Sequence, residues 1–153
     1  MKLLVFSDSH RALSGMRDAV ESQRPDYVIH LGDLERDAQL LAQEYPTLAV
    51  TGVPGNCDGF ATAPLQRLVS YGNVSILMSH GHIWSVKSGY GAAIAAARTS
   101  RADILLFGHT HVPCCVRQED GLWVVNPGSI RDSGSYAVIT IADGKADCQL
   151  KRV

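Results

Sequence analysis

The sequence predicts an α/β protein in which two β-sheets pack face to face as a sandwich and helices flank the outer faces. Up to Phe107, short apolar runs alternate with helical patterns, which is typical of β-α-β units with parallel strands. Beyond Phe107 the helical patterns stop, and strand-like runs separated by turns indicate antiparallel or mixed sheet. One domain over residues 1–153 accounts for the whole sequence.

Hydrophobic periodicity predicts the N-terminal elements. A strand is expected at 3–6 and another at 27–31, and between them Leu13, Met16 and Val20 share one face of a helix. A second helix is expected from Leu34 to about Glu44, and a strand at 47–51 precedes a glycine-rich loop at 52–59. The side chains expected to point inward from this second helix are Leu34, Ala38, Leu41 and Ala42.

The remaining elements are defined by turn residues. Gly72-Asn73 separates two apolar runs by two residues, as in a tight hairpin. An alanine-rich helix is expected from about Tyr90 to Ser100, followed by a strand at 104–107. Further strands are expected at 115–118, 122–126, 135–141 and 148–151.

Composition and charge exclude several classes of protein. The formal net charge is −1 and no run of like charges occurs, so a strong electrostatic grip on nucleic acid is not expected. Trp84, Lys87 and Arg98 form no basic and aromatic stripe, so a nucleic-acid-binding module is the weakest reading. No segment resembles a signal peptide or a membrane-spanning helix, and no membrane association is expected.

The cysteines lack the spacing of a zinc ribbon or a redox motif. They are interpreted as reduced thiols, which favours a cytoplasmic location. The four are Cys57, Cys114, Cys115 and Cys148.

Five short polar clusters each follow a predicted strand. Ligands of α/β sheets gather at the carboxyl ends of the strands, so the clusters are expected at one edge. Each cluster alone has an ordinary explanation as a turn, but five of the six histidines fall inside them, beside aspartates and an asparagine. The clusters are Asp8-Ser9-His10, Gly32-Asp33, Gly55-Asn56-Cys57-Asp58, His80-Gly81-His82 and Gly108-His109-Thr110-His111.

The residue types in these clusters indicate a metal centre. Imidazole, carboxylate and amide ligands suit divalent Mn, Fe, Zn, Co or Ni, and they are too many for one ion. Two ions about 3.5–4 Å apart, bridged by a carboxylate, would use them all and form the clamp known from phosphoryl transfer. Because only Asp8 and Asp33 are anionic, the loaded site would be positive and would attract phosphate.

The clusters, in this order, resemble the calcineurin-like metallophosphoesterases, whose pattern is D-x-H, G-D, G-N-x-[DE], a histidine after a strand, and G-H-x-H. The short length, His80-Gly81-His82 and the segment Asn126 to Ser129 resemble more narrowly the small YfcE-like phosphodiesterases, relatives of the retromer's small scaffold subunit. The resemblance implies the four-layer α/β/β/α fold of that family.

The resemblance also implies a role for each cluster residue. One ion would be held by Asp8, His10 and His111, a second by Asn56, His80 and His109, and Asp33 would bridge both. Two Mn²⁺ ions are the expected cofactors, and a metal-activated water or hydroxide would be the nucleophile.

The loop after Asn56 departs from the family pattern. Many members carry a histidine next, where it meets the leaving group, but this chain has Cys57, and a thiol is a poor proton donor at neutral pH. Cys57 and His82 are the candidate catalytic side chains. Cys57 is interpreted as a small buried or site-lining residue in preference to a nucleophile, and Asp58 as a residue that orients the loop in preference to a metal ligand. His82 is the alternative candidate for the missing proton donor or for contact with phosphate, against a purely supporting role.

The sequence therefore predicts a dinuclear metal-dependent phosphodiesterase acting on a small phosphodiester. Phosphomonoesters and pyrophosphates are alternative substrates for the same site. The alternative from another class is a non-catalytic, retromer-like interaction scaffold, which the presence of every expected ligand argues against. Assembly into a homo-oligomer stays open. His30, inside a predicted strand, is expected to be a packed, hydrogen-bonded residue.

Overall fold

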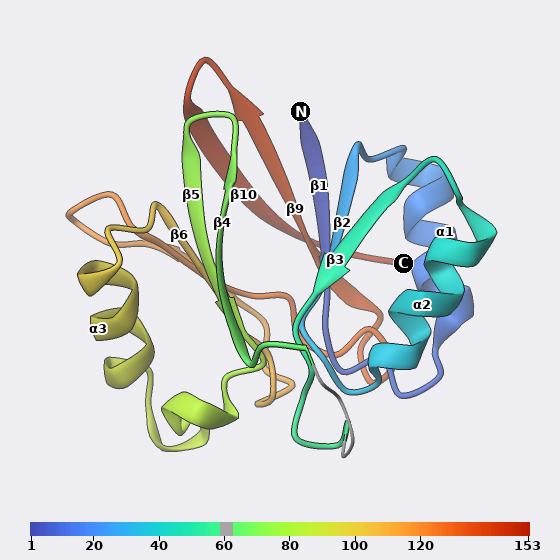
Figure 1. The fold of residues 1–153 in the computed structure, drawn as a ribbon, viewed down its shortest axis with the longest axis horizontal. Helices are drawn as coiled ribbons and strands as arrows, with labels where there is room; N and C mark the ends of the chain where they lie inside the picture. The colour runs from blue at the N-terminus through green and yellow to red at the C-terminus, as the bar shows by residue number, and fades with distance from the viewer. Residues whose placement is uncertain (59–62) are drawn as a thin grey trace.

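The computed structural model describes residues 1–58 and 63–153, and it contains two five-stranded mixed sheets packed face to face (Figure 1). The predicted fold class is confirmed. The first sheet has the spatial order β10 (Lys145–Arg152), β9 (Ser135–Ala142), β1 (Lys2–Phe6), β2 (Tyr27–His30), β3 (Ala49–Gly52). The second has the order β4 (Gln66–Tyr71), β5 (Val74–Ser79), β6 (Ile104–Leu106), β8 (Trp123–Asn126), β7 (Cys114–Arg117).

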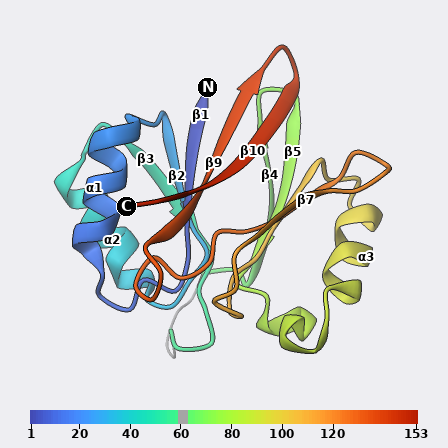
Figure 2. The same ribbon diagram turned by 180° about the vertical axis from the view of Figure 1, so that it is seen from behind.

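Helices cover the outer face of each sheet, as both views show (Figures 1 and 2). Helices α1 (Leu13–Gln23) and α2 (Glu35–Glu44) lie on the first sheet, and α3 (Gly91–Thr99) lies on the second. Two short 3₁₀ helices, His82–Trp84 and Val86–Ser88, follow β5. The sequence analysis did not predict them, because three residues are too few to establish a period.

The hydrophobic core is divided by these layers. Along β1, Leu3 and Val5 point into the space between the sheets, whereas Leu4 and Phe6 pack against the helices. Both faces of the strand are therefore apolar, as expected for strands of parallel sheets with covered faces. On the other sheet, Leu77 of β5 packs outward with α3.

Strand direction brings the loops of interest to one end of the sandwich. In the first sheet β1, β2 and β3 pair in parallel, and in the second β5, β6 and β8 do the same. The loops after β1, β2, β3, β5 and β6 all follow carboxyl ends of these strands. The mixed character predicted for the C-terminal third is confirmed, since β8 pairs in parallel with β6 and antiparallel with β7.

Most element boundaries shift by one or two residues from those predicted, and β10 begins three residues earlier, at Lys145. The strand expected at 47–51 is β3, Ala49–Gly52, and the strand expected at 115–118 is β7, Cys114–Arg117. The hairpin at Gly72-Asn73 is confirmed, with Tyr71 paired to Val74. The glycine-rich loop expected at 52–59 ends at Gly59, which lies outside the described residues.

One face of α2 differs from the prediction. Leu41 is buried, but Leu34, Ala38 and Ala42 stay partly exposed, and the buried polar residue of the helix is Asp37. The Asp37 carboxylate accepts hydrogen bonds from the loop after β1, so helical periodicity of apolar residues could not identify it. No helix in the described part of the chain is long and apolar enough to span a membrane.

Candidate metal centre

Side chains far apart in sequence meet where the loops after β1 and β6 touch. The Asp8 carboxylate is fully buried, and its Oδ2 accepts hydrogen bonds from Ser7 Oγ at 2.6 Å and from the His109 backbone N–H at 3.1 Å. The loop after β6 of the second sheet thus holds Asp8, which follows β1 of the first sheet. Because the two sheets contribute to one site, the site depends on the whole sandwich.

Three buried residues form an inner set, defined as Asp8, Asp33 and His80. His80 Nε2 lies 3.4 Å from Asp33 Oδ2 and 3.7 Å from Asp8 Oδ1, and the His80 side chain is 0% exposed. The other ring nitrogen of His80, Nδ1, lies 2.7 Å from the backbone carbonyl of Leu31. That carbonyl is an acceptor, so Nδ1 carries the proton and Nε2 points at the two carboxylates as the ring's free nitrogen whenever the ring is neutral.

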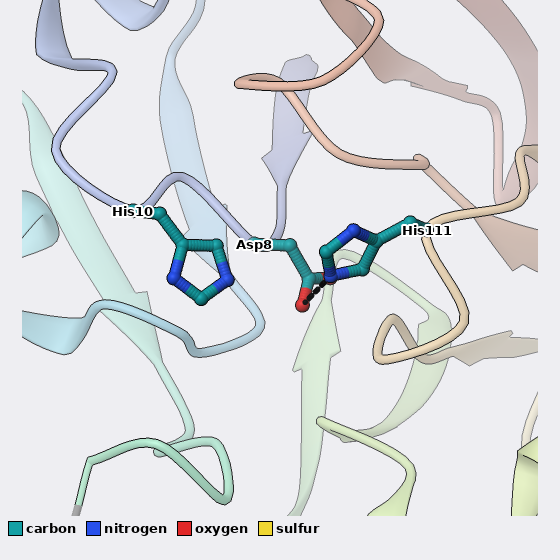
Figure 3. A group of neighbouring side chains, drawn as sticks. All are labelled: Asp8, His10 and His111. Carbon is teal, nitrogen blue, oxygen red and sulfur yellow. Dashed lines mark ion pairs between the residues drawn. The ribbon is translucent and has the colours of Figure 1, made fainter.

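The outer set, defined as Asp8, His10 and His111, shares Asp8 with the inner set (Figure 3). His111 Nε2 lies 3.1 Å from Asp8 Oδ1, and the His10 ring lies on the other side of the carboxylate. Their side chains are 36% and 25% exposed. The two sets therefore line one opening from its buried floor to its exposed rim.

Charge and burial act in opposite directions in the inner set. Burial would raise the pKa of Asp33, but the hydrogen bond and charge of His80, with the N–H of Cys57, outweigh burial and hold the pKa below its usual range. For His80, burial would lower the pKa, but Asp33 and Asp8 outweigh it and raise the pKa. The two residues therefore favour an ion pair in the metal-free protein.

Two further histidines complete the ring of imidazoles. His109 Nδ1 lies 3.2 Å from His80 Nε2, and the His82 ring lies 5.6 Å from that of His80 between centroids. Burial, followed by the charge of His80, lowers the pKa of both His82 and His109. Both rings are therefore mainly neutral at neutral pH and have lone pairs available.

Five of the seven candidate ligands adopt strained backbone conformations. Asp8, His10, Asp33, His109 and His111 all have positive φ, between 40° and 68°. Non-glycine residues in this region cost roughly 1–3 kcal/mol each, and they concentrate at functional sites. Half of the ten non-glycine residues with positive φ in the described chain are candidate ligands. This backbone strain is independent of the side-chain geometry and marks the same site.

The glycines of two clusters are required by close contacts. A Cβ atom on Gly108 would collide with Ser7 Oγ and Asp8 Oδ2, and one on Gly55 would collide with Asp33 Oδ1. Each glycine therefore allows a loop to approach a carboxylate of another loop. This contact explains why a glycine precedes the polar residues in both clusters.

The loop after β3 is held by Asp58. Its Oδ2 accepts the N–H groups of Asp33 and Gly55 at 3.0 and 2.8 Å, and its Oδ1 accepts the N–H of Glu35 at 2.9 Å. Three donors from two loops converge on one carboxylate. The predicted orienting role of Asp58 is confirmed.

Asn56 and Cys57 lie at the exposed rim. Asn56 Nδ2 lies 3.9 Å from Cys57 Sγ. The assignment of Asn56 as a metal ligand stays a prediction. The Cys57 N–H donates to Asp33 Oδ1 at 2.9 Å, and the Asp33 carboxylate, followed by burial, raises the pKa of the Cys57 thiol. Of the two interpretations of Cys57, the site-lining one agrees with its exposed position and the buried one is wrong.

A buried network lies behind the ligands. Gly32 N–H donates to His30 Nδ1, His30 Nε2 lies 2.9 Å from Ser9 Oγ, and Ser9 Oγ donates to Asp37 Oδ2 at 2.6 Å. Burial lowers the pKa of His30 to about 4, partly offset by Asp37, so the ring is neutral at neutral pH. The expectation that His30 is packed and hydrogen-bonded is confirmed. Sequence reasoning missed Asp37 and its contact with Ser9, because the two residues are 28 apart and share no motif.

A second support, which sequence reasoning also missed in part, spans residues 126–132. Asn126 Nδ2 donates to the carbonyl of Gly108 and to Thr110 Oγ1, and Ser129 Oγ donates to the carbonyl of Asp8. Within this segment the Gly128 N–H donates to Asn126 Oδ1 and the Ile130 N–H donates to the carbonyl of Ser7. Side chains therefore connect the loops after β1 and β6.

The site fits a divalent cation. Asp8 Oδ1 is a buried carboxylate oxygen without a hydrogen-bond partner among the described residues, and it faces His111 and His80. A buried anionic oxygen is costly unless something cationic compensates it. Carboxylate and imidazole together suit Mn, Fe, Co, Ni or Zn.

Comparison with known proteins identifies the family. Residues 1–144 match the model of the calcineurin-like phosphoesterase superfamily domain. The chain belongs to this superfamily. It is 30% identical over 154 residues to the probable metallophosphoesterase YsnB of Bacillus subtilis, covering 95% of this chain and 88% of YsnB. It is also 36% identical over 145 residues to vacuolar protein sorting-associated protein 29 of Schizosaccharomyces pombe, covering 91% and 77% of the two chains.

Solved structures of the superfamily share the fold. A predicted phosphoesterase from Streptococcus pneumoniae superposes with a TM-score of 0.82 at 26% identity, covering 99% of this chain and 88% of that one. The phosphoesterase YfcE of E. coli superposes with a TM-score of 0.65 at 18% identity, covering 92% and 88%, and it supports the fold alone. Both agree with the predicted α/β/β/α layers.

Proposed function

We propose that the protein is a dinuclear metal-dependent phosphodiesterase. The observation that carries the proposal is the buried Oδ1 of Asp8, which has no hydrogen-bond partner among the described residues and faces both the inner and the outer set. Two overlapping groups of ligands around one carboxylate support two neighbouring cations better than one. Membership of the superfamily and the likeness to YsnB support the wider assignment as a metallophosphoesterase.

In this proposal Asp8, His10 and His111 would hold one ion, Asn56, His80 and His109 would hold the second, and Asp33 would be shared by both. The structure adds that Asp8 Oδ1 also faces His80, so Asp8 lies close to both. Mn²⁺ is the proposed ion, with Fe, Zn, Co or Ni as alternatives. When bound, the ions would supply an activated water and positive charge for the phosphate oxygens.

The chain's own residues prepare the site. When the His80 ring is neutral, the Leu31 carbonyl holds its proton at Nδ1 and leaves Nε2 free toward the carboxylates, and Cys57 N–H fixes one oxygen of Asp33. Asn56 and Cys57 are exposed and the His111 side chain is 36% exposed, so the rim of the site is open to solvent. We propose that this open rim admits a diester, which carries two substituents on phosphorus.

Proton donation to the leaving group is the weakest part of this machinery. His82 is mainly neutral at neutral pH because burial lowers its pKa, so few molecules carry a second ring proton. The raised pKa of Cys57 keeps its thiol protonated and a weak acid. We therefore propose that substrates with stable leaving groups are cleaved fastest.

Metal analysis coupled to hydrolysis tests the proposal. The purified protein should contain or take up two Mn²⁺ per chain and hydrolyse bis-p-nitrophenyl phosphate, and chelation should abolish hydrolysis until Mn²⁺ is restored. Mononitrophenyl phosphate and pyrophosphate, assayed in parallel, test the alternative substrates. Metal uptake without turnover of any of the three would instead favour an interaction scaffold, the role suggested by the likeness to the vacuolar sorting protein.

A further inference from the structure

His111 is the most exposed histidine of the inner and outer sets, and carboxylates face both of its ring nitrogens. Nε2 lies 3.1 Å from Asp8 Oδ1, whereas Nδ1 lies 2.6 Å from Oδ2 of Asp132. Asp132 belongs to no motif of the sequence, and its side chain is 50% exposed. It is therefore a neighbour of the site that sequence reasoning did not detect.

The distance between Asp132 and His111 determines where the ring proton sits. An ionised carboxylate only accepts hydrogen bonds, so Nδ1 must carry a proton to form a 2.6 Å contact with Asp132. In a neutral ring this leaves the lone pair on Nε2, which faces Asp8. That is the protonation state a metal ligand requires at Nε2.

Asp132 is itself fixed relative to Asp8. Its backbone N–H donates to Ser129 Oγ at 3.0 Å, and the same hydroxyl donates to the backbone carbonyl of Asp8 at 2.9 Å. One serine thus connects the Asp132 loop to the loop of the shared carboxylate. The Asp132 backbone is thereby tied to the Asp8 loop, and its carboxylate contacts the side of the His111 ring away from Asp8.

In the inner set, a backbone carbonyl instead of a side chain determines which ring nitrogen of the histidine carries the proton. His80 Nδ1 donates to the backbone carbonyl of Leu31, which no substitution removes. For His111 the acceptor is a carboxylate, which a single substitution can change. The metal affinity of the outer set can therefore be altered by substituting a residue that is not itself a ligand.

We propose that Asp132 is a positioning residue that fixes the Nδ1–H form of His111 and thereby strengthens metal binding by the outer set. The inference rests on the proposed function, because it assumes that Asp8, His10 and His111 hold an ion. Carboxylates behind metal-bound histidines typically contribute 10–100-fold to metal affinity. We expect an effect of that size on one of the two ions.

Asp132→Ala, Asp132→Asn and Asp120→Ala form a matched series. Asp120 is a suitable control because its side chain is also 50% exposed and pairs with a cationic group, Arg98 at 3.0 Å, at the opposite end of the second sheet. Metal-free proteins would be titrated with Mn²⁺ by calorimetry, and with Zn²⁺ in competition with a chelator. Asp132→Ala should weaken one ion about 10–100-fold, Asp132→Asn less because its amide oxygen still accepts, and Asp120→Ala should match the native protein.

A second measurement needs neither metal nor activity. Two-dimensional ¹⁵N–¹H NMR of the histidine rings, recorded on metal-free protein in alkaline buffer, should show His111 protonated at Nδ1 in the native chain. Asp132→Ala should shift the population toward Nε2–H, while His80 keeps its form because Leu31 is unchanged. Circular dichroism verifies the fold, and if Asp132→Ala does not fold, Asp132→Asn decides the outcome.

The outcomes separate this inference from the proposed function. A native protein that binds neither Mn²⁺ nor Zn²⁺ would overturn both. A native protein that binds two ions would uphold the site, and unchanged affinities in Asp132→Ala would then overturn the inference alone. Equal weakening of both ions, or a native His111 protonated at Nε2, would also overturn it.

Discussion

The inner and outer sets use similar residues but are supported in different ways. Asp33 and His80 are buried, and backbone groups of Cys57 and Leu31 hold them. In the outer set His111 is partly exposed, and the side chain of Asp132 holds it. A backbone group that holds a ligand persists when its residue is substituted, whereas a side chain that holds a ligand can be removed by a single substitution.

The largest expected effect is the loss of the bridging carboxylate. In the proposed site Asp33 contacts both ions, so Asp33→Asn should weaken both and reduce turnover of bis-p-nitrophenyl phosphate by at least about 10²–10³-fold. The fold should persist, because an amide oxygen can still accept the Cys57 N–H. Elemental analysis and steady-state kinetics measure the two effects.

Asp103→Asn is the matched control, since Asp103 also accepts a backbone N–H, that of Ser75, at the far end of the second sheet. It should retain native metal content and turnover. An active Asp33→Asn protein that still holds two ions would remove Asp33 from the bridging position.

A smaller effect separates the two sets in the metal-free protein. In His80→Gln, Leu31 can lose its partner, and the buried Asp8 and Asp33 lose a cation. An unsatisfied buried group costs roughly 1–3 kcal/mol, whereas an exposed pair such as that of His111 contributes about 0–1 kcal/mol. Denaturant unfolding of His80→Gln and His111→Gln should show this order.

Equal unfolding free energies for the two variants would contradict the distinction between the sets. Urea is the suitable denaturant because it does not screen charge. Constant slopes of the unfolding curves would show that both variants unfold to comparable states.

The smallest effect on turnover of bis-p-nitrophenyl phosphate, whose leaving group is good, is expected at the rim, where neither set supplies a proton donor. The rate should fall steeply as the leaving group becomes more basic, because general acid help of about 10²–10⁴-fold is missing. Cys57→His should flatten this dependence by assisting poor leaving groups more than good ones. A series of aryl and alkyl phosphodiesters at saturating Mn²⁺ measures it for the native protein, Cys57→His and His82→Ala.

His82→Ala determines the role of His82 in the same series. A steeper dependence than in the native chain would assign His82 a part in protonation. A shallow native dependence that survives His82→Ala would show that the proton comes from another group.

The sequence predicted the layers and the meeting of the clusters because both follow from local patterns. Parallel strands such as β1 and β2 place their carboxyl ends at one edge, and so Asp8 and Asp33 meet. The positions of Asp37 and Asp132 were not predictable. Each acts through a contact with a loop distant in sequence, and neither falls in an apolar period or a polar cluster.

The strained backbone of the candidate ligands has an evolutionary consequence. Each left-handed residue lowers the stability of the fold, and the proposed metal binding gives a reason to retain those among the candidate ligands. A descendant of this chain that no longer needed an ion would gain stability by relaxing these loops, while the sandwich itself stayed intact. Selection for activity and selection for stability therefore pull in opposite directions at Asp8, Asp33 and His109, and drift at these positions would be an early sign that such a lineage had abandoned hydrolysis.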